Sequence, residues 1–126
     1  MTGLQQLRRG STPMLILSVL ADGRMYGYQI MRELERRSEG YFTMTAALLY
    51  PALHQLEQDG LVESEWEGAP EPKSAAGPGK RRRRYYTITP QGRKRLAHSQ
   101  AEWQCFLTRL FKTLQGGEPG TQERQL

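Results

Sequence analysis

Hydrophobic residues near the start of the chain are spaced as in a helix. The apolar run of residues 14–20 ends before Gly23, and Thr12 followed by Pro13 precedes it. This pair is typical of a helix start, because proline is tolerated in the first turn, where its missing N–H would be unpaired anyway. The pattern therefore predicts a short buried helix over this run, with residues 1–10 as a polar arm or the fraying start of a helix.

A second helix is predicted from the spacing of Ile30 and Leu34, which are four residues apart and so share one face. It should begin near residues 26–27 and end at Gly40, since glycine suits the left-handed conformation of a helix C-cap. Its charged side chains are expected to be largely solvated: Arg32, Glu33, Arg36 and Arg37.

A third helix is predicted to begin at Thr43 or Thr45, either of which can serve as its N-cap, and to end at Asp59-Gly60. Pro51 lies beyond the first turn and removes a hydrogen bond, so we expect a kink or a tightened first turn. The helix should bury one apolar face and expose one polar face. The apolar face consists of Leu49, Leu53 and Leu56, and the polar face of Tyr50, His54, Gln55 and Gln58.

Two strands are predicted after the third helix. Residues 61–67 alternate as a strand does, and residues 84–89 form a second strand of similar length. The glycines and prolines between them prevent regular structure, so a mobile loop is expected there. A helix followed by two strands and a basic loop is the layout of a β-wing.

The last helix is predicted to open at Thr89-Pro90 and to end at Gly116-Gly117. Apolar residues recur along it at gaps of seven, four, three and four, a heptad-like stripe that fits packing against another helix. The stripe consists of Leu96, Trp103, Leu107, Leu110 and Leu114.

These elements predict a mainly α fold with a small β-hairpin, divided into three parts. Residues 1–89 would form a winged helix-turn-helix DNA-binding domain with its wing at residues 61–89. Residues 90–115 would form a long C-terminal dimerisation helix, and residues 116–126 a disordered tail.

Length and charge narrow the function. The 126 residues suffice for one compact domain, and the net charge of +5 favours an anionic partner such as nucleic acid or a membrane surface. No apolar run approaches the roughly 20 residues needed to span a bilayer, and the N-terminus lacks the apolar core of a signal peptide. The single Cys105 excludes an internal disulfide and fits a reducing cytoplasm. We expect a cytoplasmic protein without a membrane partner.

The strongest chemical signal is the basic run Lys80, Arg81, Arg82, Arg83 and Arg84. Adjacent cations repel each other unless an anion compensates, and on a wing they can reach DNA phosphates and release counterions. The alternative is a solvated basic loop. The helix before the run and the tyrosines after it favour DNA binding.

The polar face of the third helix carries side chains that can read DNA. Gln55 can pair with adenine through two hydrogen bonds, while Tyr50 and His54 can contact a phosphate or a base edge. An ordinary solvated helix face would look the same from sequence, so this role depends on the neighbouring wing.

Trp103 lies on the apolar stripe of the last helix. It can be an aromatic residue of a dimer core, or a plate on which a planar ligand stacks between two subunits. His98 and Cys105 are seven residues apart on the same helix, too far for the usual metal pair, and no cluster of further ligands accompanies them. No catalytic set stands out, so we expect neither an enzyme nor a cofactor.

Four segments together resemble the PadR-like transcriptional regulators, in the short form with a single C-terminal helix. The resemblance covers about residues 10–112. The segments are Tyr26-Gly27-Tyr28, the run Leu-Tyr-Pro-Ala-Leu-His-Gln-Leu-Glu at residues 49–57, Asp59-Gly60-Leu61-Val62, and the run Arg-Tyr-Tyr-Thr-Ile-Thr-Pro-Gln-Gly at residues 84–92.

This resemblance implies a homodimer that binds a palindromic operator in double-stranded DNA and usually represses transcription. Residues 46–58 would be the recognition helix. Family members typically carry a small polar run before Leu-Tyr-Pro, whereas this chain has Ala46, Ala47 and Leu48 there, which puts one expected DNA contact in doubt. Outside the basic run, the DNA-binding residues expected are Tyr28, Thr43, Thr45, Tyr50, His54 and Gln55.

Within the family, the chain resembles the multidrug-responsive members, in which a tryptophan of the last helix stacks planar drugs at the dimer interface. Trp103 occupies that position. The resemblance implies that Leu7, Met14, Arg95, Ser99 and Leu107 line the same site, although Arg95 could favour an anionic ligand. The sequence does not identify the operator, the regulated genes or the effector.

Two rival functions stay open. One is a protein-interaction adaptor that kept the winged-helix fold but lost operator recognition, supported only by Leu48 and the alanines before it. The other is a haem or redox sensor that uses His98 or Cys105.

Overall fold

The computed structural model describes residues 2–67 and 83–116. In these ranges the chain is mainly helical with a small antiparallel sheet, which confirms the predicted fold class. The elements are helix α1 (Gly3–Leu20), strand β1 (Met25–Tyr26), helix α2 (Gly27–Arg37), helix α3 (Ala46–Gln58), strand β2 (Val62–Trp66), strand β3 (Arg84–Ile88) and helix α5 (Pro90–Leu114).

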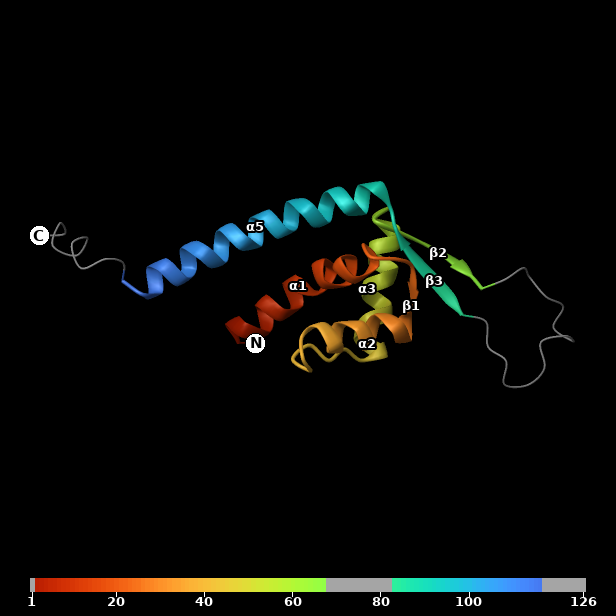
Figure 1. Ribbon diagram of the computed structural model, residues 1–126, viewed down its shortest axis with the longest axis horizontal. Coiled ribbons are helices and arrows are strands. Elements are labelled where there is room, and N and C mark those ends of the chain that lie inside the picture. The colour runs from red at the N-terminus through yellow and green to blue at the C-terminus, as the bar shows by residue number, and fades with distance from the viewer. Residues whose placement is uncertain (1, 68–82, 117–126) are drawn as a thin grey trace, which may run out of the picture. The chain divides into compact units, whose positions relative to one another are not determined.

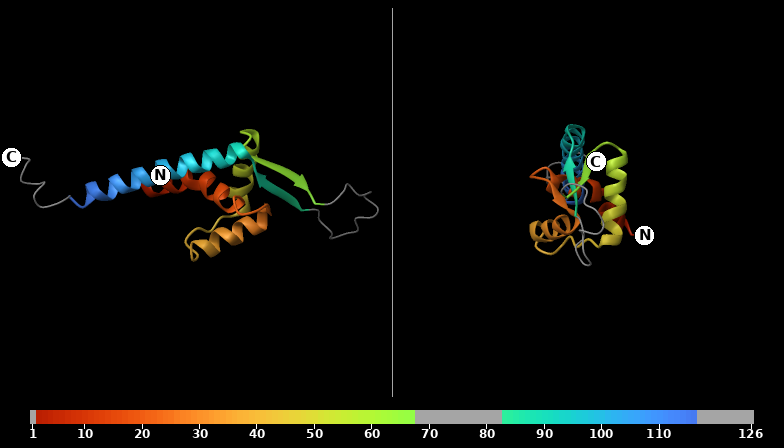
Figure 2. Two further views of the ribbon diagram at one scale, coloured as in Figure 1. Left: turned by 45° about the horizontal axis from the view of Figure 1, so that its top comes forward. Right: turned by 90° about the vertical axis from the view of Figure 1, so that its right-hand side faces the viewer.

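The chain divides into two units, the first ending at Leu96 and the second beginning at Ala97. In the first unit, helices α1, α2 and α3 pack together at the base of the sheet, and the β2–β3 hairpin extends away from them (Figure 1 and Figure 2). One apolar core holds these elements together. It contains Ile16, Leu17, Val19, Leu20, Ile30, Leu34, Leu49, Leu53, Leu56, Leu61, Val62, Tyr86, Ile88 and Leu96.

Helix α1 is longer than predicted. It begins at Gly3 and passes through Pro13, so the expectation of a polar arm and of a start at Thr12-Pro13 was wrong. The cause is a capping box at the true start: the Thr2 hydroxyl accepts from the Gln5 amide at 3.2 Å, and the Gln5 side chain accepts from the Thr2 amide at 2.9 Å. Pro13 is exposed on the outside of the helix, where the chain tolerates the missing hydrogen bond.

Helices α2 and α3 follow the predicted boundaries closely. The N-cap of α3 is Thr45, and its first turn holds a 3₁₀-type bond from the Leu48 amide to the Thr45 carbonyl at 3.1 Å beside the regular bond from Leu49 at 2.9 Å. The helix then continues through Pro51 without interruption. Its predicted inner leucines are buried.

The sheet has one strand that the sequence pattern did not predict. Strand β1 pairs with β3, which also pairs with β2, so the order is β1-β3-β2. The register places Tyr26 opposite Tyr85 and Trp66 opposite Arg84. A strand of two residues is too short to show alternation, which is why only its partner reveals it. Strand β1 ties the start of α2 to the wing.

The end of the wing is locked to the start of α5. The Thr89 hydroxyl donates to the Gly60 carbonyl at 2.7 Å and accepts from the Gly92 amide at 2.9 Å. Gly92 lies so close to Leu61 that a Cβ there would collide with the Leu61 carbonyl oxygen. A glycine is therefore required at this position for the hairpin and the helix start to meet.

The second unit contains most of α5. Its helix ends at Leu114, and Gly116 has the left-handed φ of 79° that favours glycine after a helix. Phe106, Phe111 and Leu114 are exposed by about half or more, at 49%, 55% and 70%. The predicted tail lies outside the described residues from 117 on. Among the described helices, none is long and apolar enough to cross a membrane.

Candidate nucleic-acid interface

The outward face of α3 carries the side chains expected to read DNA. Tyr50, His54 and Gln55 are all exposed, as the helical spacing predicted. The Gln55 amide donates to Asp59 at 3.1 Å, so this side chain would have to release a weak local bond before pairing with a base. Leu48, in the first turn, is 51% exposed and presents an apolar surface where related proteins carry a polar one.

Tyr50 packs against the start of α2. A Cβ at Gly27 would collide with the Tyr50 hydroxyl, so only glycine allows the tyrosine ring to lie over this backbone. Gly27 is buried and Tyr50 is still 45% exposed, which means that one side of the ring is held while the other faces solvent. The sequence motif at residues 26–28 thus acts by positioning a side chain from another helix, a role that spacing alone did not reveal.

Tyr28 lies on the exposed side of α2 next to Arg32. Its ring is 55% exposed, and its hydroxyl accepts a hydrogen bond from the Arg32 guanidinium at 2.9 Å. That bond raises the pKa of Arg32. Because the hydroxyl accepts from Arg32, its own hydrogen remains available to donate to a phosphate.

Two threonines flank the start of the recognition helix. Thr43 and Thr45 are both exposed, and the Thr45 side chain makes no cap hydrogen bond although Thr45 is the N-cap. Hydroxyls in this position can donate to a phosphate near the positive end of the helix. Both residues therefore remain predicted DNA contacts.

The wing arginines have different surroundings. Arg84 donates to Ser64 at 2.9 Å and forms an ion pair with Glu57 at 3.4 Å, so part of its guanidinium is held within the hairpin. The guanidinium of Arg83 stacks on the ring of Tyr26 at 4.6 Å. Lys80, Arg81 and Arg82 lie outside the described residues. Contact of this run with DNA stays a prediction.

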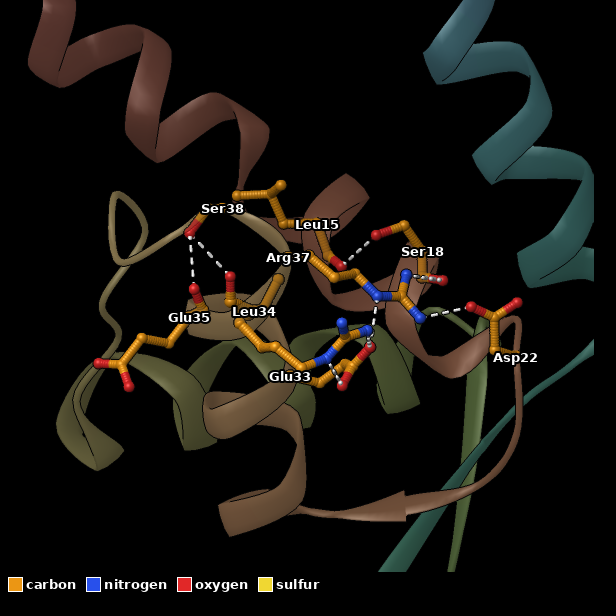
Figure 3. A network of polar contacts seen from close by, with 9 residues as sticks. Leu15, Ser18, Asp22, Glu33, Leu34, Glu35, Arg37 and Ser38 are labelled. Atoms are coloured by element: carbon orange, nitrogen blue, oxygen red, sulfur yellow. Dashed lines mark hydrogen bonds and ion pairs between the residues drawn. The ribbon is translucent and has the colours of Figure 1, made fainter.

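The far end of α2 shows a contrasting use of arginine. Arg37 forms ion pairs with Asp22 and, at 2.7 Å, with Glu33, and Arg36 pairs with the same carboxylate at 2.6 Å (Figure 3). These bonds, first from Arg36 and then from Arg37, lower the pKa of Glu33 to about 2. The expectation that Glu33 and Arg37 are largely solvated was wrong, since their side chains are only 20% and 33% exposed.

The residues predicted to hold a ligand come from two helices. Leu7 and Met14 lie on α1, and Arg95, Ser99, Trp103 and Leu107 lie on α5. On α5, Trp103 contacts Phe106 edge to face, with ring centroids 6.3 Å apart. Phe106 and Phe111 escaped the heptad reading because they flank the stripe rather than continue it.

The sensor residues have ordinary surroundings in the structure. Cys105 is exposed, and His98 is 3.5 Å from Glu102 one turn away. No group of three or more metal-ligating side chains gathers among residues 2–67 and 83–116.

Comparisons with known proteins give a consistent result. The model of the family described as "Transcriptional regulator PadR-like family" matches residues 16–98. Transcriptional regulator Rv3488 of Mycobacterium tuberculosis is 30% identical over 118 residues, which cover 94% of this chain and 95% of that protein. A solved PadR family transcriptional regulator from Eggerthella lenta is similar with a TM-score of 0.72 and 32% identity, covering 88% of each chain. A transcriptional regulator from Clostridium thermocellum has a TM-score of 0.71 and 27% identity over 89% of this chain and 96% of that one.

Proposed function

The chain belongs to the PadR-like family of transcriptional regulators, and we propose that it is a homodimeric repressor of a palindromic operator that a small planar ligand releases. As a member of this family it is a DNA-binding regulator and not an enzyme. Because such a regulator acts on chromosomal DNA, the proposal places it in the cytoplasm.

One observation carries the operator proposal: the recognition helix and the wing both present phosphate- and base-contacting groups to solvent. Tyr50 is held over Gly27 with its outer side free, and Arg83 lies on Tyr26 at the start of the returning strand. Tyr28 has a hydroxyl hydrogen left to donate. In the proposed mode, α3 enters the major groove, with Gln55 and His54 at base edges, while the wing holds the flanking backbone.

The dimer proposal is supported by the apolar surface of α5. Phe106, Phe111 and Leu114 leave large apolar areas in water, which a second copy of the helix could bury. Leu96, Trp103, Leu107 and Leu110 complete the proposed interface. Two recognition helices held in this way would reach successive major grooves about 34 Å apart.

Ligand relief would work through the same interface. Trp103 offers a ring for stacking, with Leu7, Met14, Arg95, Ser99 and Leu107 as the further proposed contacts. A ligand can shift the dimer only if it binds better to a spacing of subunits that misfits the operator. The proposal therefore requires ligand and operator to weaken each other's binding by the same factor.

The test is a titration of the purified protein with DNA from upstream of its own coding sequence, at several salt concentrations. Replacing Arg81 to Arg84 by alanine should weaken binding to every duplex, and the slope of log affinity against log salt should fall by roughly 0.9 for each phosphate that is no longer neutralised. Replacing Gln55 by alanine should instead change the preference among duplexes. Unchanged affinity and slope in the first variant would remove the wing from the proposed interface.

The ligand is tested in the same samples with planar cationic dyes. Quenching of Trp103 emission together with release of DNA is expected, and Trp103→Leu should abolish both effects. Selective DNA binding with no Trp103 response would leave a repressor whose signal lies elsewhere.

A second candidate function is a winged-helix adaptor that binds protein rather than an operator. The exposed Leu48 on the recognition helix favours it, since an apolar side chain there suits a protein surface better than a phosphate. This candidate predicts weak DNA binding without preference among duplexes. Replacement of Leu48 by threonine would then leave DNA selectivity absent, whereas a repressor should keep or sharpen it.

A further inference from the structure

Tyr26 joins two parts of the interface that are far apart in sequence. It is the last residue of β1 and the N-cap of α2, and its backbone amide donates to the Gln29 side chain at 3.1 Å. In the sheet it is opposite Tyr85 of β3. Its backbone is therefore fixed both by the helix start and by the wing.

The Tyr26 ring lies in a row of alternating cations and aromatic rings. The guanidinium of Arg83 is 4.6 Å from the centroid of the Tyr26 ring, which meets the Tyr85 ring edge to face at 5.5 Å and 88°. The guanidinium of Arg24 lies 4.3 Å from the Tyr85 centroid on the continuation of the row. The two cations thus sit on rings from two adjacent strands.

The two cations of this row differ in what meets the edge of the guanidinium. The edge of Arg24 forms an ion pair with Glu65 at 2.8 Å. Among the described residues, no carboxylate pairs with Arg83. A guanidinium stacked by its flat face keeps its N–H donors free in the plane, where they match the geometry of a phosphate.

We propose that Tyr26 is a positioning residue for DNA binding: its ring holds the flat face of Arg83 and directs the open N–H edge toward a backbone phosphate. Since the ring is anchored at the start of α2, this phosphate contact is placed in register with Tyr28 and Tyr50 on the same side of the fold. The inference rests on the proposed wing contact and adds the group that orients it. Arg24 has the same stacking but is already neutralised by Glu65, so it supplies no such contact.

A double-mutant cycle tests this proposal, using fluorescence anisotropy with a labelled duplex of about 30 base pairs from upstream of the coding sequence, long enough for two half-sites one helical turn apart. Tyr26→Leu removes the aromatic face and should weaken binding about two- to five-fold, the range for an exposed cation–π contact. Arg83→Ala should weaken binding at least as much and reduce the salt slope by roughly 0.9. In the double variant the loss should equal that of Arg83→Ala alone, because the ring acts only through the cation.

Two further variants keep the test sharp. Tyr26→Phe retains the ring and the fold and should bind like the unchanged protein. Arg24→Ala removes a stacked cation whose edge is already paired, and it should leave the salt slope unchanged. Circular dichroism and thermal unfolding of each variant establish that the comparison is between folded proteins.

Each outcome has a distinct meaning. Additive losses from Tyr26→Leu and Arg83→Ala, or full affinity in Tyr26→Leu, would overturn the positioning role while leaving the wing contact intact. A loss in Tyr26→Phe equal to that of Arg83→Ala would overturn it as well, because the hydroxyl and not the ring would then matter. An unaffected Arg83→Ala variant would overturn the wing contact itself, and the positioning role with it.

Discussion

The two ends of α2 use arginines in opposite ways. At the C-terminal end, Arg36 and Arg37 are neutralised by Glu33 and Asp22, and the pairs connect α2 to the end of α1. At the N-terminal end, the nearby Arg83 stacks on the ring of Tyr26. A carboxylate satisfies both the charge and the hydrogen bonds of a guanidinium, whereas a ring occupies only its flat face. The first end is thus a structural contact, and the second keeps donors for an external anion.

This difference shows why a count of cations does not locate a DNA-binding surface. The net charge of +5 suggests an anionic partner, but the identity of each arginine's neighbour decides which part of the charge is available. If this view is right, changes at the N-terminal end of α2 should affect DNA affinity, and changes at the C-terminal end should affect stability alone.

The largest effect is expected from Gly27→Ala at the N-terminal end. The new Cβ would collide with the Tyr50 hydroxyl, and because this hydroxyl is the far end of an exposed side chain, the ring should swing away while the fold survives. Loss of a charge-assisted hydrogen bond to phosphate would then weaken DNA binding about ten-fold. The measurement is DNA affinity together with thermal unfolding.

The control for Gly27→Ala is the same substitution in a Tyr50→Ala background. There the methyl group has no phenol to displace, so it should cost no additional DNA affinity. A second loss of similar size in this background would show that Gly27 acts on DNA by a route other than Tyr50, and the comparison of the two ends would lose its clearest support.

A smaller effect, of the opposite kind, is expected from Arg37→Ala. Its ion pairs with Glu33 and Asp22 are partly exposed, so their removal should lower the free energy of unfolding by about 1 kcal/mol. The salt slope of DNA binding should not change. Arg36→Ala is the matched control: its side chain is 71% exposed and should cost less stability. A reduced salt slope in Arg37→Ala would mean that this end also contacts DNA.

The sequence predicted most of the fold because its helices carry strong periodic and capping signals. Helix α3 has its leucines on one face and a threonine N-cap, and the structure follows both. The beginning of α1 was missed although a signal was present, the Thr2-to-Gln5 spacing of a capping box. Thr12-Pro13 was the stronger pattern on paper, but a proline inside a helix is tolerated where its ring faces solvent.

The candidate site was less predictable, since its geometry depends on contacts between distant segments. The exposed face of α3 followed from helical spacing, yet the support of Tyr50 by Gly27 and of Arg83 by Tyr26 requires the pairing of β1 with β3. That pairing involves two residues of β1 and so leaves no periodicity to detect. Likewise, a charged run such as residues 32–37 looks solvated until α1 supplies Asp22.

The smallest expected effect is a pH dependence that belongs to the C-terminal end of α2 alone. The pKa of Glu33 is lowered from 4.5 to about 2, mainly by its bonds to Arg36 and Arg37, so its ionised form stabilises the folded state above pH 4.5. This contribution should disappear as the pH falls from about 4.5 to about 2. Glu33→Gln has no such group to protonate, so urea unfolding should show a shallower decline in stability across this interval than in the unchanged protein. Arg36→Ala, which removes the partner that lowers the pKa most, should fall between the two, and identical pH profiles in all three would mean that the carboxylate is not held by these arginines in solution.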